Sequence, residues 1–162
     1  MSDTKVVVRT PMQMLKQDHG VVKDLFAAYA KLGDGDIQEK DRHWQAINEE
    51  LTIHAEIEER IFYPAVREVK TDEAEDLVNE ALEEHHVVKT LLEEMSELEP
   101  GDEAFDAKMK VLREHVEHHA EEEEKEMFPQ AKQLSKEVLE TLVIEMEALK
   151  NDLEDREEQD SE

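Results

Sequence analysis

The chain has 162 residues, of which 45 are acidic and 19 are basic, so its formal net charge is −26. This charge argues against nucleic acid or an anionic membrane surface as a partner. The lack of cysteine excludes disulfides, thiol catalysis and iron–sulfur ligation, and four glycines and four prolines beside 40% charged residues favour long helices.

The first ten residues, MSDTKVVVRT, contain only a short apolar run and predict neither a signal peptide nor a membrane span. We expect them to form a flexible arm. A cytoplasmic protein with a single main domain is the expectation from this length and this N-terminus.

Two helices are predicted before Pro64. The first spans residues 11–32 and begins at a capping box formed by Thr10 and Gln13. The second spans residues 37–63, and in it Glu58 interrupts an otherwise apolar stripe. Because an unpaired buried carboxylate is costly, a bound cation is a natural partner for that glutamate. Pro64 is expected to break or kink the second helix.

The next two predicted helices, at 72–98 and 103–128, repeat the first two and are separated by a turn at residues 100–102. A fifth amphipathic segment at 135–153 is expected to pack on the outside of the bundle or on another chain. The expected organisation is a flexible arm at 1–10, a bundle at 11–130, a C-terminal helix at 131–154 and a disordered acidic tail at 155–162.

One motif occurs twice. Residues 54–64 read HAEIEERIFYP and residues 119–129 read HAEEEEKEMFP, with six of eleven positions identical. Upstream, HGVVKDL at 19–25 matches HHVVKTL at 85–91. Each HxxxE places a histidine and a glutamate on one helix face, about 6 Å apart along the axis, where both can hold a metal ion. A duplicated helical hairpin is the simplest explanation.

Short connections between four long helices predict an all-α fold, an antiparallel up-down-up-down four-helix bundle with a pseudo-twofold internal repeat and an additional C-terminal helix. Six residues would then point into one interior layer: His19, His54, Glu58, His85, His119 and Glu123. Four imidazoles and two carboxylates suit two first-row transition ions. Iron or manganese fits best by ligand type, zinc is an alternative, and so much nitrogen disfavours calcium and magnesium.

The segments DHGVVKDL, HAEIEERIFYP, HHVVKTLL and HAEEEEKEMFP resemble those of the haemerythrin-like, HHE cation-binding proteins, over residues 11–130. The resemblance implies a four-helix bundle that holds two Fe ions in a non-haem centre with an oxo or hydroxo bridge. It also implies that Glu58 and Glu123 bridge the irons, and that the four histidines of the repeat are terminal ligands.

The chain departs from the oxygen-carrying haemerythrins at two places. They have a further histidine one turn after the third-helix ligand and an aspartate near the last motif, where this chain has Lys89 and Glu123. Each iron would keep an open position, which suits reaction with H2O2, O2 or NO better than reversible oxygen carriage. The pattern is similar to mycobacterial proteins linked to peroxide handling and to iron–sulfur-repair proteins, although the latter usually carry a cysteine-bearing segment.

Three functions stay open from the sequence. The first is a di-iron protein that consumes peroxide or oxygen, with a catalase-like activity if it is an enzyme. The second is a sensor or carrier of oxygen, nitric oxide or iron, without turnover. The third is a metal-free helical interaction module. A monomer or a weak homodimer is expected in each case.

Three further residues flank the predicted centre. His115, one turn before His119, is expected to be partly exposed, with a supporting role near the metal as the alternative. Tyr63 is expected to pack beside Pro64 rather than to donate a hydrogen bond to a bridging glutamate. Glu122 is expected on a solvated face, with a contact to a ligand as the alternative.

Overall fold

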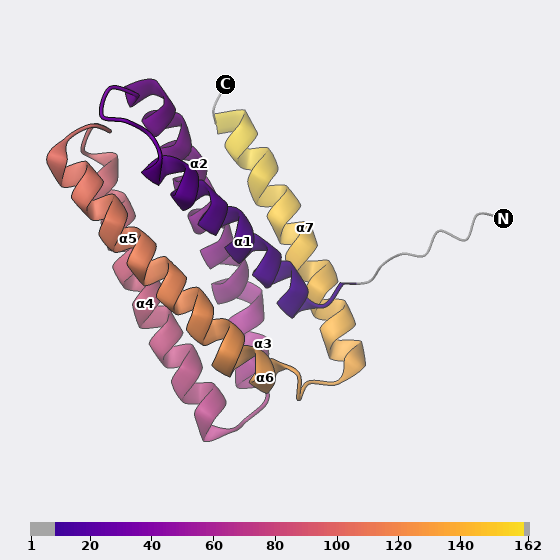
Figure 1. Ribbon diagram of the computed structural model, residues 1–162. Helices are drawn as coiled ribbons and strands as arrows, with labels where there is room; N and C mark the ends of the chain where they lie inside the picture. The colour runs from indigo at the N-terminus through magenta and orange to yellow at the C-terminus, as the bar shows by residue number, and fades with distance from the viewer. Residues whose placement is uncertain (1–8, 161–162) are drawn as a thin grey trace.

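The computed structural model describes residues 9–160, and this part of the chain is helical without a strand. Figure 1 shows the long helices of the bundle running antiparallel to one another, with α7 lying along the outside. The elements are α1 (Pro11–Ala30), α2 (Ile37–Ile57), η1 (Glu58–Phe62), α3 (Tyr63–Arg67), α4 (Asp72–Ser96), α5 (Glu103–Glu122), η2 (Glu123–Met127), α6 (Phe128–Ala131) and α7 (Lys136–Asp160).

The predicted bundle with an additional C-terminal helix is confirmed. Helix α1 packs along α2, and α4 packs along α5, so each half of the sequence repeat forms one hairpin. Helix α7 packs on α1, α2 and η1, where Leu142, Val143 and Met146 are buried. None of the described helices is long and apolar enough to cross a membrane.

Local signals fix the helix starts and turns. Thr10 and Gln13 form the predicted capping box at the start of α1. Thr71 accepts a hydrogen bond from the backbone of Ala74 and so caps α4. Gly101, in the turn before α5, has φ +106°, and a Cβ there would lie 2.4 Å from the side chain of Ile37. This turn therefore requires glycine.

The two ends of the chain differ from expectation where the structure describes them. Residues 1–8 of the expected arm lie outside the described residues, but Arg9 binds Glu147 on α7 at 2.8 Å. Helix α7 extends to Asp160, so the expectation of a disordered tail is wrong for residues 155–160. An ion pair between Arg156 and Asp152, one turn apart, supports this exposed end of the helix.

Both prolines of the repeat sit just after a widened, π-helical turn. The backbone N–H of Tyr63 bonds to the carbonyl of Glu58, and that of Phe128 bonds to Glu123, five residues back in each case. A proline ring collides with the carbonyl four residues before it in an α-helix. The wide turn relieves this collision, so the helix continues past Pro64 to Arg67 instead of breaking there.

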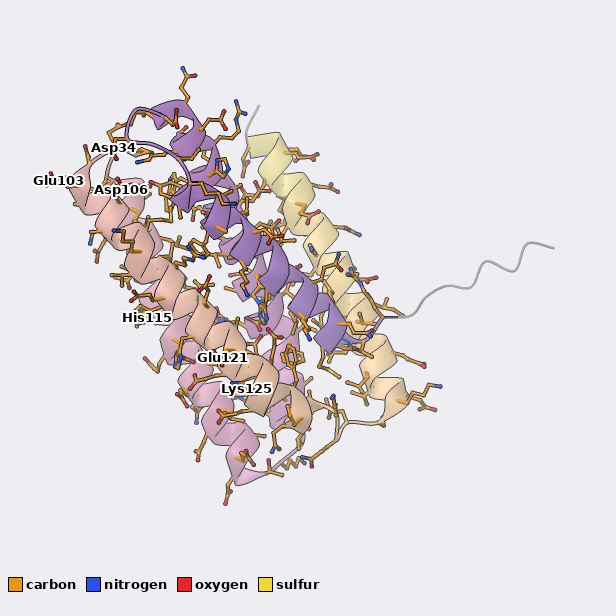
Figure 2. The ribbon with its side chains drawn as sticks, viewed as in Figure 1. Asp34, Glu103, Asp106, His115, Glu121 and Lys125 are labelled. Atoms are coloured by element: carbon orange, nitrogen blue, oxygen red, sulfur yellow. The ribbon has the colours of Figure 1, made fainter. Side chains whose placement is uncertain are left out.

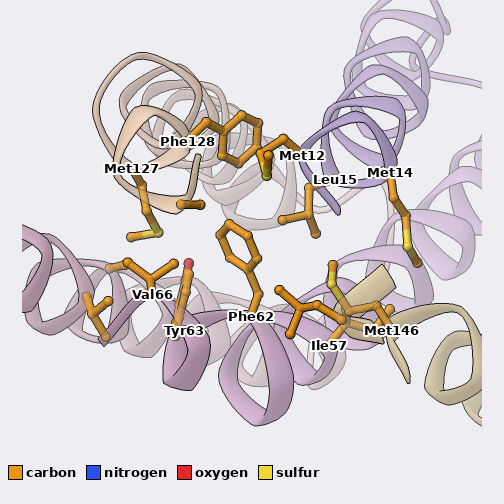
Figure 3. Close-up of a cluster of buried hydrophobic side chains, with 14 of the residues drawn as sticks. Met12, Met14, Leu15, Ile57, Phe62, Tyr63, Val66, Met127, Phe128 and Met146 are labelled. Carbon is orange, nitrogen blue, oxygen red and sulfur yellow. The ribbon is translucent and has the colours of Figure 1, made fainter. Parts of the chain in front are cut away.

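The apolar core consists of two clusters. Figure 3 shows the first, which includes Phe62, Val66 and Met146. The second lies toward the other end of the bundle and includes Phe26, Trp44 and Phe105. Each fully buried large side chain of this kind contributes about 1.5–3 kcal/mol to folding. Each of the four bundle helices, with α5 counted together with η2 and α6, contributes to both clusters. The histidine of the repeat lies near the point where one cluster gives way to the other along the helix.

The second cluster is closed by polar contacts at its end of the bundle. The Tyr29 hydroxyl donates to Asp106 Oδ1 at 2.8 Å, and Lys40 Nζ lies 3.2 Å from Asp106 Oδ2. Figure 2 labels Asp106 at this end of α5, near Asp34 and Glu103.

Candidate metal centre

The structure brings the six predicted residues together in one layer between the apolar clusters. His19 comes from α1, His54 and Glu58 come from the α2–η1 segment, His85 comes from α4, and His119 and Glu123 come from the α5–η2 segment. Glu58 is 0% exposed and Glu123 is 2% exposed. Such carboxylates require positive partners, because an ionised group in an apolar interior is otherwise strongly destabilising.

The histidines form two pairs. The ring centroids of His19 and His54 are 5.0 Å apart, and those of His85 and His119 are 4.9 Å apart. Each pair joins one histidine from a motif-bearing helix with one from the helix that packs on it.

Each glutamate touches both pairs. Glu58 Oε1 lies 3.1 Å from His54 Nε2 and 3.2 Å from His85 Nε2. Glu123 places Oε1 at 3.2 Å from His19 Nε2, and Oε2 at 3.2 Å from His119 Nε2. A carboxylate that reaches one histidine of each pair is in the position of a bridge between two cations.

Several of these atoms are buried without a hydrogen bond, although they crowd together. Among the described residues they are His19 Nε2, His54 Nε2, both carboxylate oxygens of Glu58, and Glu123 Oε1. Buried polar atoms are rarely left unpaired in this way. Imidazole nitrogens and carboxylate oxygens that crowd together in this way fit a shared cation, so the residues present fit the metal that the donor set suggests.

The donor atoms divide into two groups whose members lie within 4.8 Å of one another. One group contains His19, His54, Glu58 and Glu123, and the other contains Glu58, His85 and His119. Glu58 belongs to both. The layer could therefore hold two metal ions that share at least one carboxylate.

Every histidine of the layer is supported on its outer nitrogen by an acidic side chain. The Nδ1 atoms contact carboxylate oxygens at 2.9–3.1 Å, in the pairs His19–Glu124, His54–Asp18, His85–Glu59 and His119–Glu84. Because a carboxylate only accepts, each Nδ1–H donates, and each Nε2 is left free to face the interior.

These four acidic residues were not among the predicted site residues. Each stands directly beside a predicted ligand in the sequence, and each supports a histidine on a different helix. Asp18 and Glu84 precede His19 and His85, while Glu59 and Glu124 follow the two motif glutamates. An acid therefore recurs at matching positions of both repeats, and that recurrence is the signal that could have identified them.

The layer stabilises positive charge on its histidines. Burial alone lowers the pKa of His119, but the carboxylates of Glu123 and Glu84 outweigh burial and raise that pKa to about 10. Burial also lowers the pKa of His54, but the carboxylates of Glu58 and Asp18 outweigh burial and raise that pKa well above its usual value. Burial raises the pKa of Glu123, yet its contacts with Glu58 and the histidines hold it well below the usual range.

Tyr63 takes part in the layer, so the expectation that it only packs is wrong. Its hydroxyl donates to Glu123 Oε2 at 2.8 Å and lies 3.1 Å from His85 Nε2. Burial and the charges of Glu123 and Glu58 raise the pKa of Tyr63, so the phenol keeps its proton. The matching residue of the second repeat, Phe128, instead stacks on His19, with ring centroids 6.3 Å apart.

The other two flanking residues lie farther out. His115 is exposed on α5, as expected, and Figure 2 labels it on that helix. Glu122 lies near His118 and Glu84, so it approaches a residue that supports His119 and not a donor of the layer itself.

A cavity of about 920 Å³ adjoins the histidines on the side of the second apolar cluster. All four histidines of the layer form part of its wall. Molecules that enter the cavity can therefore lie against the histidine side chains of the layer.

Comparisons with known proteins agree with this fold. The family model of the haemerythrin HHE cation-binding domain matches residues 10–131. The crystal structure of a haemerythrin HHE cation-binding domain-containing protein from Mycobacterium kansasii has a TM-score of 0.77 and 24% sequence identity. That match covers 90% of this chain and 87% of the other, and it supports the fold.

A curated relative, a DNA nickase from Nostoc sp., is 29% identical over 144 residues, which is 88% of this chain but 40% of the nickase. The chain thus spans well under half of that relative's length. Because the family match covers most of the residues and includes all six donors of the interior layer, the chain belongs to the haemerythrin HHE cation-binding domain family and carries a metal-binding domain of that kind.

Proposed function

We propose that the chain holds two iron ions in the histidine layer, and that this centre binds or reacts with hydrogen peroxide, dioxygen or nitric oxide. His19 and His54 would hold one ion, His85 and His119 would hold the other, and the carboxylates of Glu58 and Glu123 would be shared between them. A di-iron pair supplies the capacity to bind such small molecules and to exchange electrons with them.

The observation that carries the proposal is the placement of the two buried glutamates, each within 3.2 Å of a histidine from both pairs. Both oxygens of Glu58 are also buried without a hydrogen-bond partner, which is rare for polar atoms in a protein interior. Two cations bound between the pairs account for this arrangement.

The chain's own residues prepare the site for chemistry. Asp18, Glu59, Glu84 and Glu124 orient the imidazoles through Nδ1 and so hold each Nε2 toward the interior of the layer. The Tyr63 hydroxyl holds a proton 2.8 Å from Glu123 Oε2, at the edge of the layer.

The experiment is an iron determination with an absorption spectrum on aerobically purified protein, followed by peroxide turnover. About two irons per chain with near-ultraviolet charge-transfer absorption are expected. Multiple turnovers of hydrogen peroxide that are lost in His54→Ala would support an enzyme. Stable complexes with dioxygen or nitric oxide without turnover would support a sensor or carrier. Zinc, or substoichiometric metal with a featureless spectrum, would contradict the proposal.

The likeness to a DNA nickase raises DNA as a substrate, and the charge of this chain disfavours it. A net charge of −26 repels the phosphate backbone, which supplies most non-specific affinity for DNA. We expect no nicking of supercoiled plasmid by the iron-loaded chain. Metal-dependent nicking that is lost in Glu58→Ala would instead support a shared activity with that relative.

A further inference from the structure

The cavity beside the histidine layer is larger than the proposed small ligands require. Its volume of about 920 Å³ is enough for on the order of thirty water molecules, and dioxygen or peroxide is similar in size to one or two. Cavities of roughly 300–1,000 Å³ are typical of sites for organic ligands. The size alone therefore points to a larger occupant.

The inner wall of the cavity is mostly apolar and is supplied by all four helices of the bundle. Its apolar side chains are Val22, Phe26, Leu51, Val88, Leu92 and Val116. Apart from the metal layer, the polar groups of the inner wall are few, and Asp18 is already bonded to His54 and Lys150. Away from the metal layer, a charged group would lose its hydration against this wall without a free partner of opposite charge.

The rim also offers little to an anion. Four lysines reach it. Lys89 lies 2.8 Å from Glu59, Lys16 lies 4.0 Å from Glu124, and Lys125 pairs with Glu121 at 2.5 Å. The fourth, Lys23, makes no ion pair with the described residues. Carboxylates outnumber the lysines around the opening. Figure 2 labels Glu121 and Lys125 on the α5 side of this rim.

On the opposite side of the opening, α1 presents a residue without a side chain. Gly20 lines the cavity, and a Cβ built on it would meet no atom within 4 Å. The matching position of the second repeat is His86. The lining of the cavity on α1 thus has no side chain at this position.

We propose that the cavity binds one uncharged, mostly apolar organic molecule, with its polar end toward the histidine layer. The apolar body would lie against the side chains of the second cluster, where burial of its surface stabilises the complex. The role of the cavity as a substrate pocket rests on the proposed function. If the metal centre reacts with a molecule bound in this cavity, the substrate class is neutral organic molecules with an oxygen-bearing head, such as alkyl hydroperoxides.

Binding can be measured on the full-length purified chain with N-phenyl-1-naphthylamine, a neutral apolar dye that fluoresces in apolar sites. We expect saturable binding of about one dye per chain, displaced by 1-decanol, with sodium decanoate about tenfold weaker as a competitor because its charge must be desolvated.

Two pairs of variants locate the dye. Val88→Phe on α4 and Val116→Phe on α5 fill the cavity and should each weaken binding about tenfold. Val87→Phe and Val111→Phe add the same atoms to the same helices at residues that are 41% and 42% exposed, and should change binding less than about twofold. Circular dichroism establishes which variants fold. Because two variants fill the cavity independently, the test stays decisive if one of them does not fold.

The proposal is overturned if the dye does not saturate, if both folded fillers bind it like the wild type, or if decanoate competes better than decanol. Iron content measured on the same samples separates the two proposals. Binding that follows the expected variant pattern in a chain with no iron would retain the cavity site and sink the proposed function. Two irons per chain without dye binding would support the proposed function and contradict the cavity site.

Discussion

The two copies of the repeated motif place the same donor types in different surroundings. Glu58 and Glu123 both reach one histidine of each pair, but only Glu123 accepts a hydrogen bond from a tyrosine. The tyrosine, Tyr63, comes from the first copy, and its counterpart Phe128 has no hydroxyl to return to Glu58. Duplication thus explains the symmetry of the donors, and a single change between copies introduces an asymmetry at the carboxylates.

The acids that support the motif histidines differ as well. Asp18, which supports His54, is 3% exposed and also bonds Lys150 of α7 at 2.7 Å. Glu84, which supports His119, has a side chain that is 26% exposed, and among the described residues no lysine pairs with it. Helix α7 covers only the first hairpin's side of the layer, so it stabilises one of two otherwise matching histidines.

Removing the motif glutamates should give the largest difference between the copies. Glu58 belongs to both donor groups and Glu123 to one. Glu58→Ala is expected to lose nearly all iron, and Glu123→Ala to keep about one iron per chain, because a site short of a ligand binds far more weakly. Elemental analysis after gel filtration measures this. Equal iron retention in both variants would contradict the assignment of Glu58 to both donor groups and of Glu123 to one.

Neutralising the supporting acids should have an intermediate effect. Loss of such a partner typically costs about 10–100-fold in metal affinity. We expect the loss of metal affinity in Asp18→Asn to lie toward the upper end of that range. The loss in Glu84→Gln should lie toward the lower end, since water can replace the more exposed carboxylate of Glu84. Competition with a chelator of known affinity measures both. A larger loss in Glu84→Gln would show that α7 does not set the difference.

The two buried tyrosines that donate to carboxylates provide a third comparison. Tyr63→Phe leaves Glu123 without its donor and should lower the free energy of unfolding by about 1–3 kcal/mol, with a changed absorption spectrum. Tyr29→Phe, at the far end of the bundle, should cost about 1 kcal/mol and leave the spectrum unchanged. Urea unfolding and absorption spectra of both variants test this, and a spectral change in Tyr29→Phe would refute it.

The smallest expected effect is at alkaline pH. Burial and the nearby carboxylate of Asp106 raise the pKa of Tyr29 above its ordinary value of 10.0. The folded state therefore holds the phenol proton more tightly than the unfolded state, so this contribution is complete below pH 10 and is lost as the pH rises further. Urea unfolding between neutral and alkaline pH should show a shallower decline in Tyr29→Phe than in the wild type. Parallel declines would contradict this.

Much of this arrangement could be predicted from the sequence, because a repeat with histidine and glutamate at helical spacing constrains both fold and layer. The bundle, the additional helix and the meeting of the six residues all follow from periodicity. The supporting acids do not, because each acts on a neighbouring helix, and periodicity along one helix does not say which residues of another it faces.

The role of Tyr63 was missed for a geometric reason. In an α-helix, a residue five positions after Glu58 faces about 140° away from it, so packing beside Pro64 was the natural expectation. The π-helical turn at Glu58–Phe62 brings residue i+5 back over residue i, and the hydroxyl turns into the layer. Both copies of the motif contain the proline. The proline alone does not show that the preceding turn is π-helical, and the direction of the Tyr63 side chain depends on that turn.

The central claim is that two metal ions lie between the histidine pairs and share the motif glutamates. Anomalous diffraction at the iron absorption edge, on crystals of the purified chain, tests it most directly. We expect two peaks, one between His19 and His54 and one between His85 and His119, with both within reach of Glu58. A single peak, or iron at the outer group of Glu84, His118 and Glu122, would contradict the account.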